Sequence, residues 1–311
     1  MKTLLVGYKA ADLFERGKHG RQKTAKWLDG DVTCHTLDIY HRHAIEKTHH
    51  IKAVCSAHLP DGPWDVIKFR TGPKIMSGEL SLDMLQEIHL LRPGKFELDF
   101  IGKERDRNDL LAKIKDDPGR VRDFKAVWPA SVPGGGKLMF TSTPGCFCHR
   151  RLDEGGLALA EVISRDSAQA GSASLKLLDM GCGCGLVGFL VKSVVKDIGL
   201  VMVDSHSRAV EAANINAANF KMNAEVILAD AGTPARMDGT FDIFAGNPPY
   251  YSDYRIAEVF LETAVRALKP GGVAYTVVKN EAGLKPVQER YFPSVEVIRR
   301  RGYSVLKSVK N

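Results

Sequence analysis

A glycine-rich turn between a buried strand and an apolar helix constrains the fold of this chain more than any other feature of its sequence. The apolar run 175–180, which includes Asp179, leads directly into Gly181, Gly183 and Gly185, and apolar residues at helical spacing follow. Glycine adopts positive φ without strain and lets a ligand approach the backbone closely. The pattern predicts a ligand-binding loop at the carboxyl end of a strand.

Strand and helix signals alternate through the second half of the chain. The predicted strands are the apolar runs 175–180, 200–203, 225–228, 241–245 and 273–278, and helical apolar spacing predicts helices over 209–217 and 260–268. Pro270 and Gly271 are expected to stop the second of these helices. Strands that alternate with helices indicate a parallel sheet covered on both faces, in which ligands bind beyond the carboxyl ends of the strands.

The first half of the chain contains a weak repeat of this pattern. Asp65 precedes Pro93 by 28 positions, and Asp242 precedes Pro270 by the same interval. In both copies an apolar helix precedes the proline and an alternating strand follows it. We therefore expect two similar α/β domains in tandem, in keeping with the ~150 residues typical of one domain. The alternative is a chance similarity between two α/β segments.

The first copy is expected to keep the scaffold and to lack the site. Its first strand, 3–6, runs into Gly7-Tyr8-Lys9 without a glycine series. Arg70 occupies the position that matches Asn247 in the second copy.

The domain boundaries follow from composition. The predicted domains are residues 1–127 and 144–311, and 128–143 is a predicted linker because prolines and glycines cluster there. Residues 164–174 are expected to form a loop of small polar side chains ahead of the glycine-rich strand.

Two carboxylates follow the next two predicted strands. Asp204 lies 19 residues after Gly185 and can accept hydrogen bonds from both hydroxyls of a ribose. Asp230 is placed to meet an adenine edge. The glycine pattern alone is ambiguous, since Gly183, Gly185 and Gly188 also spell the Gly-x-Gly-x-x-Gly fingerprint of dinucleotide binding.

The tetrapeptide Asn247-Pro248-Pro249-Tyr250 resolves this ambiguity, because a dehydrogenase has no use for it. It follows the run 241–245 and so reaches the same sheet edge as the glycine loop. An exocyclic or amide nitrogen is a poor nucleophile because its lone pair is delocalised. The Asn side-chain oxygen and a carbonyl held rigid by the prolines can each accept one N–H bond and turn the lone pair toward an electrophile. The tyrosine can stack on a planar substrate. A tight Asn-Pro turn without a catalytic role is the alternative.

These motifs resemble those of class I S-adenosylmethionine-dependent methyltransferases that modify planar nitrogen; they are 179–185, Asp204, Asp230 and 247–250. A closer similarity is to the RsmC/RlmG-like family of rRNA guanine-N2 methyltransferases, through 144–147, 152–155 and Lys279-Asn280. The resemblance is specific over 144–311 and architectural over 1–125. Tyr250 stands where the family often has phenylalanine.

The resemblance implies two tandem Rossmann-like methyltransferase domains, of which the N-terminal one is degenerate and helps to bind RNA. It implies S-adenosyl-L-methionine as the cofactor and ribosomal RNA or a ribosomal subunit as the partner. The residues that it assigns to the cofactor are Asp179, Gly181, Gly183, Gly185, Asp204 and Asp230, and those that it assigns to the amine and its ring are Asn247, Pro248, Pro249 and Tyr250. The implied reaction is direct methyl transfer to guanine N2, without a metal.

Other functions remain open from the residues. An Asn-Pro-Pro-Tyr motif also suits methylation of adenine N6 or of a protein glutamine amide. The glycine pattern leaves a nicotinamide-dependent oxidoreductase as a further alternative, and a non-catalytic RNA-binding protein is another. Retention of Asp179, Asp204 and Asn247 argues against the non-catalytic reading.

The charge pattern suits a polyanionic partner. The net charge is +7, with +6 on residues 1–150, −4 on 151–250 and +5 on 251–311. Solvated surface charge is the alternative explanation. The run 299–301, which is three arginines, is expected either to touch phosphates or to form a solvated basic turn.

The remaining features are expected to be structural. No apolar run approaches the ~18 residues of a membrane span, and 4–6 is too short for a signal-peptide core. We therefore expect a cytoplasmic protein with reduced thiols. The Cys-x-Cys pairs at 146/148 and 182/184 lack the usual spacing of zinc ligands and are expected to fill tight loops. The histidines at 41, 43, 49 and 50 are expected on the surface.

Overall fold

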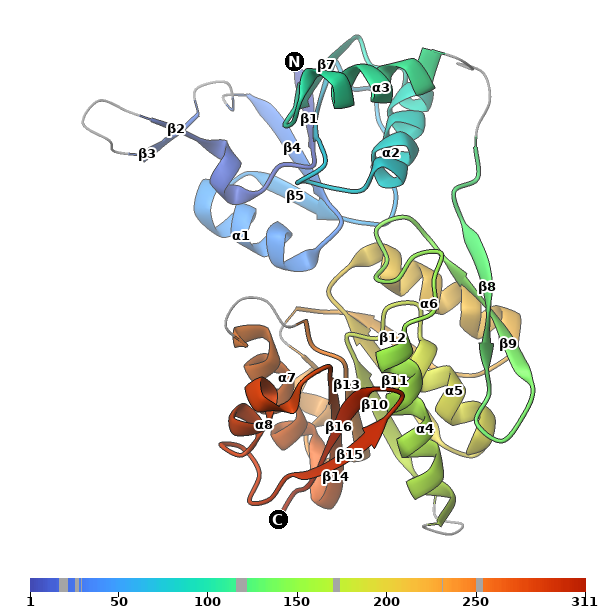
Figure 1. The fold of residues 1–311 in the computed structure, drawn as a ribbon. Coiled ribbons are helices and arrows are strands. Elements are labelled where there is room, and N and C mark those ends of the chain that lie inside the picture. Colours follow the sequence, from blue (N-terminus) through green and yellow to red (C-terminus); the bar gives the residue numbers. More distant parts are fainter. Residues whose placement is uncertain are drawn as a thin grey trace. The chain divides into compact units, whose positions relative to one another are not determined.

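The computed structural model describes residues 1–16, 22–25, 28, 30–115, 122–169, 174–230, 232–249 and 254–311. The described residues form two compact units (Figure 1). Unit 1 comprises 1–125 with the short segments 143–145 and 206–208, and unit 2 comprises 126–142, 146–205 and 209–311.

The described part of unit 1 contains a five-stranded parallel sheet in the order β5-β4-β1-β6-β7. Its strands are β1 (Lys2–Val6), β4 (Asp31–Thr36), β5 (Lys52–Cys55), β6 (Val66–Thr71) and β7 (Lys95–Phe100). The other elements are the 3-10 turn η1 (Ala10–Leu13), the hairpin strands β2 (Phe14–Arg16) and β3 (Gln22–Thr24), and the helices α1 (Ile39–His49), α2 (Gly78–Leu91) and α3 (Glu104–Lys115).

Helices cover both faces of the unit 1 sheet. Leu4 and Val6 of β1 share a core with Met84 of α2, whereas Leu5 shares a core with Ile45 of α1. Burial on both faces explains why this strand reads as a continuous apolar run rather than as an alternating one. The expectation that His49 lies on the surface is wrong, because this side chain is buried and its Nε2 lies 2.7 Å from the Ala10 carbonyl oxygen.

In the described ranges of unit 2, seven strands form one sheet in the order β12-β11-β10-β13-β14-β16-β15. They are β10 (Lys176–Met180), β11 (Gly199–Asp204), β12 (Glu225–Leu228), β13 (Phe241–Gly246), β14 (Leu268–Val278), β15 (Glu296–Arg300) and β16 (Tyr303–Val309). Strands β10 to β14 pair in parallel, and β16 is antiparallel to both neighbours. The predicted parallel sheet of the second half is therefore confirmed.

The helices of unit 2 cover both faces of this sheet, with α4 and α5 on one side and α7 and α8 on the other (Figure 1). They are α4 (Glu154–Gln169), α5 (Leu186–Val194), α6 (Ser207–Phe220), α7 (Arg255–Ala267) and α8 (Glu281–Gln288), with a 3-10 turn η4 (Ala235–Met237). Leu177 of β10 packs in the core with α4, α5 and α6, and its neighbour Leu178 packs in the core with α7. Helix α7 ends three residues before Pro270, so the proline lies at the start of β14.

The predicted linker, 128–143, is a β-hairpin instead. Strands β8 (Ala126–Ser131) and β9 (Lys137–Ser142) pair antiparallel within unit 2. The glycines that suggested a linker, 134–136, form only the turn, where all three have positive φ. Trp128 and Phe140 are cross-strand partners in this hairpin, with ring centroids 5.3 Å apart. Phe140 also packs against Phe189 of α5 and Phe220 of α6, so tertiary packing orders the hairpin.

The predicted polar loop over 164–174 also differs from the structure. Helix α4 continues through the serine-rich and alanine-rich sequence as far as Gln169, and residues 170–173 lie outside the described residues. Ser164 and Ser167 are buried. Small side chains at these positions serve close helix packing, which composition alone does not distinguish from a loop.

Phe140→Ala is expected to lower the free energy of unfolding by about 3–5 kcal/mol, measured by chemical denaturation. The Phe140 ring is fully buried and contacts the rings of Trp128, Phe189 and Phe220 at centroid distances of 5.3, 6.5 and 5.0 Å. Val127→Ala on the facing strand is the matched control. The side chain of Val127 is 63% exposed, so its loss should change stability by no more than about 0.5 kcal/mol. Equal effects of the two variants would contradict this assignment of the core.

The five-stranded sheet of unit 1 has the same strand order as the five parallel strands β12-β11-β10-β13-β14 of unit 2, and the central strands end in a corresponding register. In unit 1, Val6 at the end of the central strand pairs with Phe69. In unit 2, Met180 at the end of the central strand pairs with Gly246. The residues that follow these partners are Arg70 and Asn247, the same pair that the sequence repeat aligns.

Candidate active site

The glycine loop follows β10 and rests on the end of β11. Gly181, Gly183 and Gly185 have φ values of 67°, 56° and 86°, which L side chains rarely adopt. The backbone N–H groups of Gly181 and Cys182 both donate to the Val203 carbonyl, at 2.8 and 3.1 Å. All three predicted glycines therefore lie in one tight turn at the carboxyl edge of the sheet.

The three glycines differ in what surrounds them. A Cβ at Gly185 would lie 2.5 Å from the Phe189 ring, and a Cβ at Gly181 would lie 2.7 Å from the Phe260 ring. Among the described residues, a Cβ at Gly183 would meet only the Cys146 Sγ, at 4.0 Å. Close packing requires glycine at positions 181 and 185, whereas Gly183 leaves room for a ligand to approach the backbone.

Asp179 holds the junction between the loop and helix α5. Its Oδ2 accepts a hydrogen bond from the Gly188 backbone N–H at 2.9 Å. Gly185, at the N-cap position, has no side chain, and Asp179 supplies the missing acceptor from the neighbouring strand. The carboxyl is almost fully buried, and this burial, together with the charge of Asp204, raises the pKa of Asp179 to about 7. Asp179 therefore supports the loop from beneath and does not face the open edge.

Asp179→Asn is expected to flatten the dependence of stability on pH between about pH 4 and pH 7. Because the pKa of Asp179 in the folded protein lies above its ordinary value, this group stabilises the fold at low pH. That contribution is lost as pH rises through the folded-state pKa. An asparagine oxygen can still accept from Gly188 and does not titrate. The melting temperature of Asp179→Asn should therefore rise relative to that of the unaltered protein as pH increases across this range. A difference that does not change with pH would contradict the raised pKa of buried Asp179.

The two other predicted carboxylates lie at the ends of the next strands. Asp204 ends β11, and its Oδ2 accepts from the Gly183 backbone N–H at 2.9 Å. Asp230 follows β12 and is partly buried. The backbone connects them, since the Ala229 N–H donates to the Asp204 carbonyl at 3.0 Å. Asp204 thus touches the glycine that is open to a ligand.

Asn247 leaves the sheet beside the glycine loop. Since Met180 pairs with Gly246, the next residues, Gly181 and Asn247, emerge from neighbouring parallel strands at the same edge. The Asn247 Nδ2 donates to the Asp153 Oδ2 at 2.8 Å. The glycine loop and Asn247 therefore lie at the same edge of the sheet, after neighbouring strands.

The prolines after Asn247 continue from this edge. Pro248 is buried and Pro249 is partly buried. The predicted stacking residue, Tyr250, lies outside the described residues.

Asp153 is a further functional candidate, and it belongs to the segment 152–155 that carries part of the family resemblance. It stands immediately before α4, and its Oδ1 accepts from the Gly155 N–H at 3.1 Å. Burial raises its pKa, although hydrogen bonds from Gly156, Gly155 and Asn247 favour the carboxylate. The available signal was an aspartate that precedes two glycines at the start of an apolar helical run.

Cys146 of the first Cys-x-Cys pair lies beside Cys184 of the second pair, which belongs to the glycine loop. Cys146, Cys182 and Cys184 are buried, and Cys148 is partly buried. A hydrogen bond with Cys184, together with burial, raises the pKa of Cys146, and burial raises the pKa of Cys182. Within the described residues, no three His, Cys, Asp or Glu side chains are arranged to hold a metal ion. Buried thiols with raised pKa values are poor nucleophiles, so their role here is packing.

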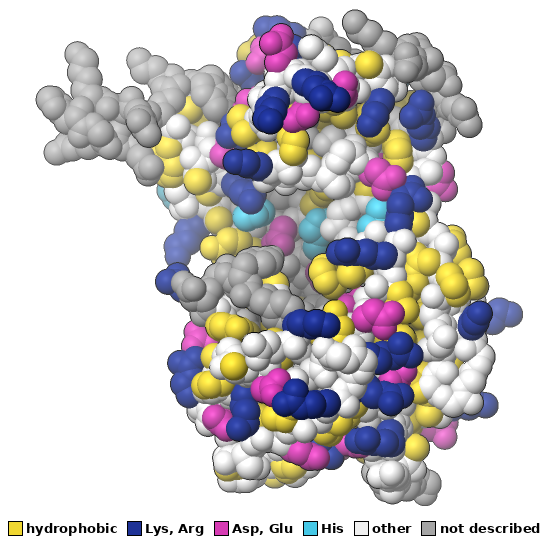
Figure 2. All heavy atoms as spheres, in the orientation of Figure 1, with side chains coloured by type: hydrophobic (Ala, Val, Ile, Leu, Met, Phe, Trp, Pro, Cys, Tyr) yellow, Lys and Arg dark blue, Asp and Glu magenta, His cyan; other side chains and the backbone are white. Residues whose placement is uncertain are grey.

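The arginines at 299–301 form ion pairs within unit 2 rather than a free basic surface. Arg299 pairs with Glu281, Arg300 with Glu161, and Arg301 with Glu161 and Glu154. These contacts connect the β15–β16 hairpin to α4 and α8. Figure 2 shows that Lys and Arg side chains on the viewed face are interspersed with acidic ones.

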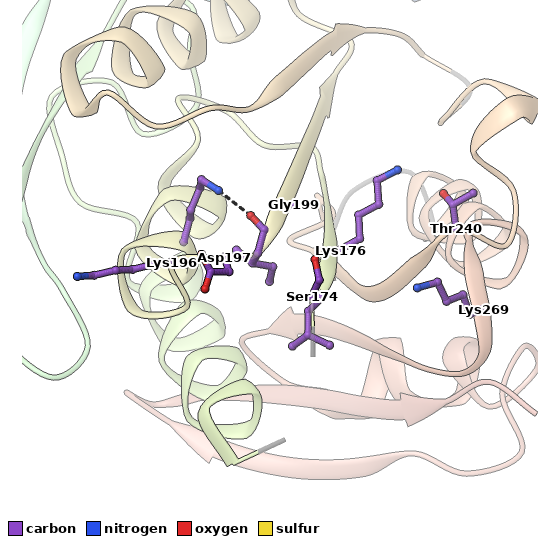
Figure 3. A pocket seen from close by; sticks show the side chains of 10 residues that line it. Ser174, Lys176, Lys196, Asp197, Gly199, Thr240 and Lys269 are labelled. Carbon is purple, nitrogen blue, oxygen red and sulfur yellow. Dashed lines mark hydrogen bonds between the residues drawn. The ribbon is translucent and has the colours of Figure 1, made fainter. Parts of the chain in front are cut away.

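A pocket of about 430 Å³ lies at the opposite, amino-terminal edge of the same sheet (Figure 3). It is lined by Lys176, Lys192, Lys196 and Lys269, but their ammonium groups do not converge. Lys192 donates to the Ile198 carbonyl at 2.6 Å and Lys269 pairs with Asp242 at 2.7 Å. Lys196 and Lys176 extend in different directions. None of the predicted site residues lines this pocket.

A doubly covered sheet with a glycine loop, a carboxylate and an Asn-Pro-Pro turn at one edge defines a Rossmann-like methyltransferase domain. Residues 137–307 match the methyltransferase small domain family, and the chain belongs to that family. In the described part of the chain, no helix combines the length and the apolar character that crossing a membrane requires.

Individual relatives agree with this assignment. The Bacillus subtilis protein YbxB, named as uncharacterized, is 28% identical over 61% of this chain and 94% of its own length. Ribosomal RNA small subunit methyltransferase C of Pseudomonas aeruginosa is 32% identical over 50% of this chain. The chain spans about half the length of that relative and of its Haemophilus influenzae counterpart.

A solved structure matches the whole chain. It is the T. thermophilus 16S rRNA N2 G1207 methyltransferase (RsmC) in complex with AdoMet and guanosine. The TM-score is 0.79 and the sequence identity 16%, and the match covers 100% of this chain and 88% of that one. At this identity the match establishes a common fold.

Proposed function

We propose that this chain transfers a methyl group from S-adenosyl-L-methionine to an exocyclic nitrogen, N2 of guanine in ribosomal RNA. The observation that carries the proposal is the pairing of Met180 with Gly246, which sets the glycine loop and Asn247 side by side. The names of the ribosomal RNA methyltransferase relatives, and the AdoMet and guanosine of the matched structure, support the choice of donor and base.

The described residues fit such a cofactor. Among the described residues only the Cys146 Sγ, at 4.0 Å, would approach a Cβ at Gly183, and the carboxylate of Asp204 lies against the same glycine. Gly181, Gly183 and Gly185 would hold the methionine portion, Asp204 the ribose and Asp230 the adenine amine. Asp179 would act indirectly, by fixing the start of α5. When bound, S-adenosylmethionine supplies a methyl group on a positive sulfonium, which is already an activated electrophile.

The remaining task of the protein is alignment of the amine. The Asn247 side-chain oxygen and the Pro248 carbonyl would each accept one N–H bond from the amine, while Tyr250 stacks on the base. Fixing the amine in this way converts an encounter in solution into an oriented one. No metal and no covalent enzyme intermediate are required in this scheme.

Residues 1–125 of the predicted domain 1–127 are proposed to be a degenerate copy of the catalytic domain that helps to bind RNA, since residues 126–142 belong to unit 2. In unit 1 the position that matches Asn247 holds Arg70, whose guanidinium pairs with Asp99 at 2.6 Å and with Asp12 at 3.2 Å. This ion-pair cluster and the absence of a glycine series after β1 support loss of the site. The proposed partner is ribosomal RNA or a ribosomal subunit, met in the cytoplasm.

Labelled methyl transfer to ribosomal RNA from a strain that lacks this protein tests the proposal. The purified chain is expected to place the label on RNA, and nucleoside analysis is expected to recover it in N2-methylguanosine. Label in N6-methyladenosine would show that the base is adenine and not guanine. Absence of label from both naked RNA and assembled subunits would overturn the proposed activity.

A further inference from the structure

Asp153 contacts the side chain that the proposed reaction depends on. Its Oδ2 lies 2.8 Å from the Asn247 Nδ2, although the two residues are 94 positions apart. Its Oδ1 accepts from the Gly155 N–H, and the Gly156 N–H is a further donor to the same carboxyl. Donor groups therefore surround the Asp153 carboxyl, which is the environment of an acceptor.

The sequence around Asp153 is shaped to permit these contacts. A Cβ at Gly156 would lie 2.7 Å from the Asp153 Oδ2, and a Cβ at Gly155 would lie 3.4 Å from its Oδ1. Any side chain at position 156 would displace the oxygen that holds Asn247. The two glycines also lie in the first turn of α4, which begins at Glu154, so their N–H groups belong to the helix start that favours a negative charge.

We propose that Asp153 is a positioning residue that fixes the orientation of the Asn247 amide and thereby makes the site select an amine. An amide has a donor end and an acceptor end, and an ionised carboxylate can only accept. Asp153 therefore binds the NH₂ end of Asn247. The Oδ1 end is left as the group that Asn247 can present to a substrate.

This orientation has a consequence for the class of substrate. An acceptor at the open end of Asn247 is satisfied by an N–H donor of a planar amine and leaves a carbonyl oxygen unpaired. Guanine presents both an exocyclic amine and a carbonyl oxygen on the same ring. If the Asn247 amide were reversed, its NH₂ group would face the substrate and would favour the carbonyl oxygen over the amine. The inference rests on the proposed function, since it concerns the amine at that site.

Asp153→Asn is the direct test, because it keeps the shape and removes the obligatory acceptor. The introduced amide oxygen would accept from Gly155, which turns the introduced NH₂ toward Asn247 and reverses its amide. We expect kcat to fall roughly 50-fold, in line with one misoriented hydrogen bond at a reacting group. The affinity for S-adenosylhomocysteine, measured by calorimetry, should stay unchanged. Glu154→Gln removes a neighbouring, half-exposed carboxylate and should leave both quantities unchanged.

The double variant Asp153→Asn/Asn247→Asp separates positioning from a merely structural role. The amide introduced at 153 would donate to the carboxylate introduced at 247, whose second oxygen would again accept from the amine. The double variant should therefore be more active than either single variant. Three outcomes would overturn the inference. Asp153→Asn could be as active as the unaltered protein, or it could lose activity through weaker S-adenosylhomocysteine binding. The double variant could also show no rescue. Failure of the proposed function would differ from all three, because the unaltered protein itself would methylate no guanine.

Discussion

Asn247→Ala abolishes methyl transfer, with an expected loss of about 1000-fold or more in kcat, while cofactor affinity stays the same. The alanine removes the side-chain oxygen that would accept from the amine, and alignment is the main contribution of the protein to this reaction. Asn247 makes no hydrogen bond to the glycine loop in the described contacts; its amide donates to Asp153. Single-turnover methyl transfer to ribosomal RNA and calorimetry with S-adenosylhomocysteine measure the two quantities.

Asn214→Ala is the control for this variant. Asn214 lies exposed on α6, where its amide donates to the Val210 carbonyl of its own helix at 2.9 Å. Its removal should leave both transfer and cofactor affinity unchanged. Unaltered transfer by Asn247→Ala would remove the proposed role of the Asn side chain, and loss of cofactor binding in that variant would move Asn247 to the cofactor site.

Asp204→Ala is expected to weaken cofactor binding by about 100-fold or more. Two ribose hydroxyls would donate to this carboxylate, and each hydrogen bond to a charged group contributes about 1.5–3 kcal/mol. The alanine also removes the acceptor that holds the Gly183 N–H at 2.9 Å, so the loop loses one of its supports. Titration with S-adenosylmethionine and with S-adenosylhomocysteine, followed by fluorescence or calorimetry, measures the loss.

Two comparisons separate the charge of Asp204 from its support of the loop. Asp204→Asn keeps an oxygen for Gly183 and should show an intermediate loss. Asp197→Ala, an exposed carboxyl at the opposite edge of the sheet, should bind the cofactor normally. If a nicotinamide dinucleotide stabilises the protein against heat and S-adenosylmethionine does not, the assignment of the loop to a sulfonium cofactor is wrong.

The fold of the second half was predictable because its signals are local and periodic. The five predicted strands are mainly apolar runs, since both faces of the sheet are covered, as Leu177 and Leu178 illustrate by packing in two different cores. The C-terminal strands β15 and β16 are not such runs and were not predicted. The glycine series could be read as a turn because glycines at three alternate positions after a strand permit positive φ, and all three have positive φ in the structure. Parallel strands then bring their carboxyl ends to one edge, which is why Gly181 and Asn247 were expected to meet.

The two wrong predictions, the linker over 128–143 and the loop over 164–174, both relied on local composition where non-local packing decides the structure. Proline and glycine content suggested a linker where β8 and β9 form, and small polar residues suggested a loop where α4 continues. In both places the order comes from packing against distant side chains: Phe140 of β9 packs against Phe189 and Phe220, and α4 packs on α5. Local composition carries no record of such partners.

The amino-acid order by itself determined the alternation of strands and helices, the glycine turn and the chemistry available at the ends of the strands. The tertiary structure decided which of those groups touch. It turned Asp179 inward to the Gly188 N–H, set Asp153 against Asn247, and engaged the arginines at 299–301 in ion pairs. Backbone conformation is governed by neighbours in the chain, whereas the partner of a polar side chain is chosen by burial and by groups that folding brings in from far along the sequence.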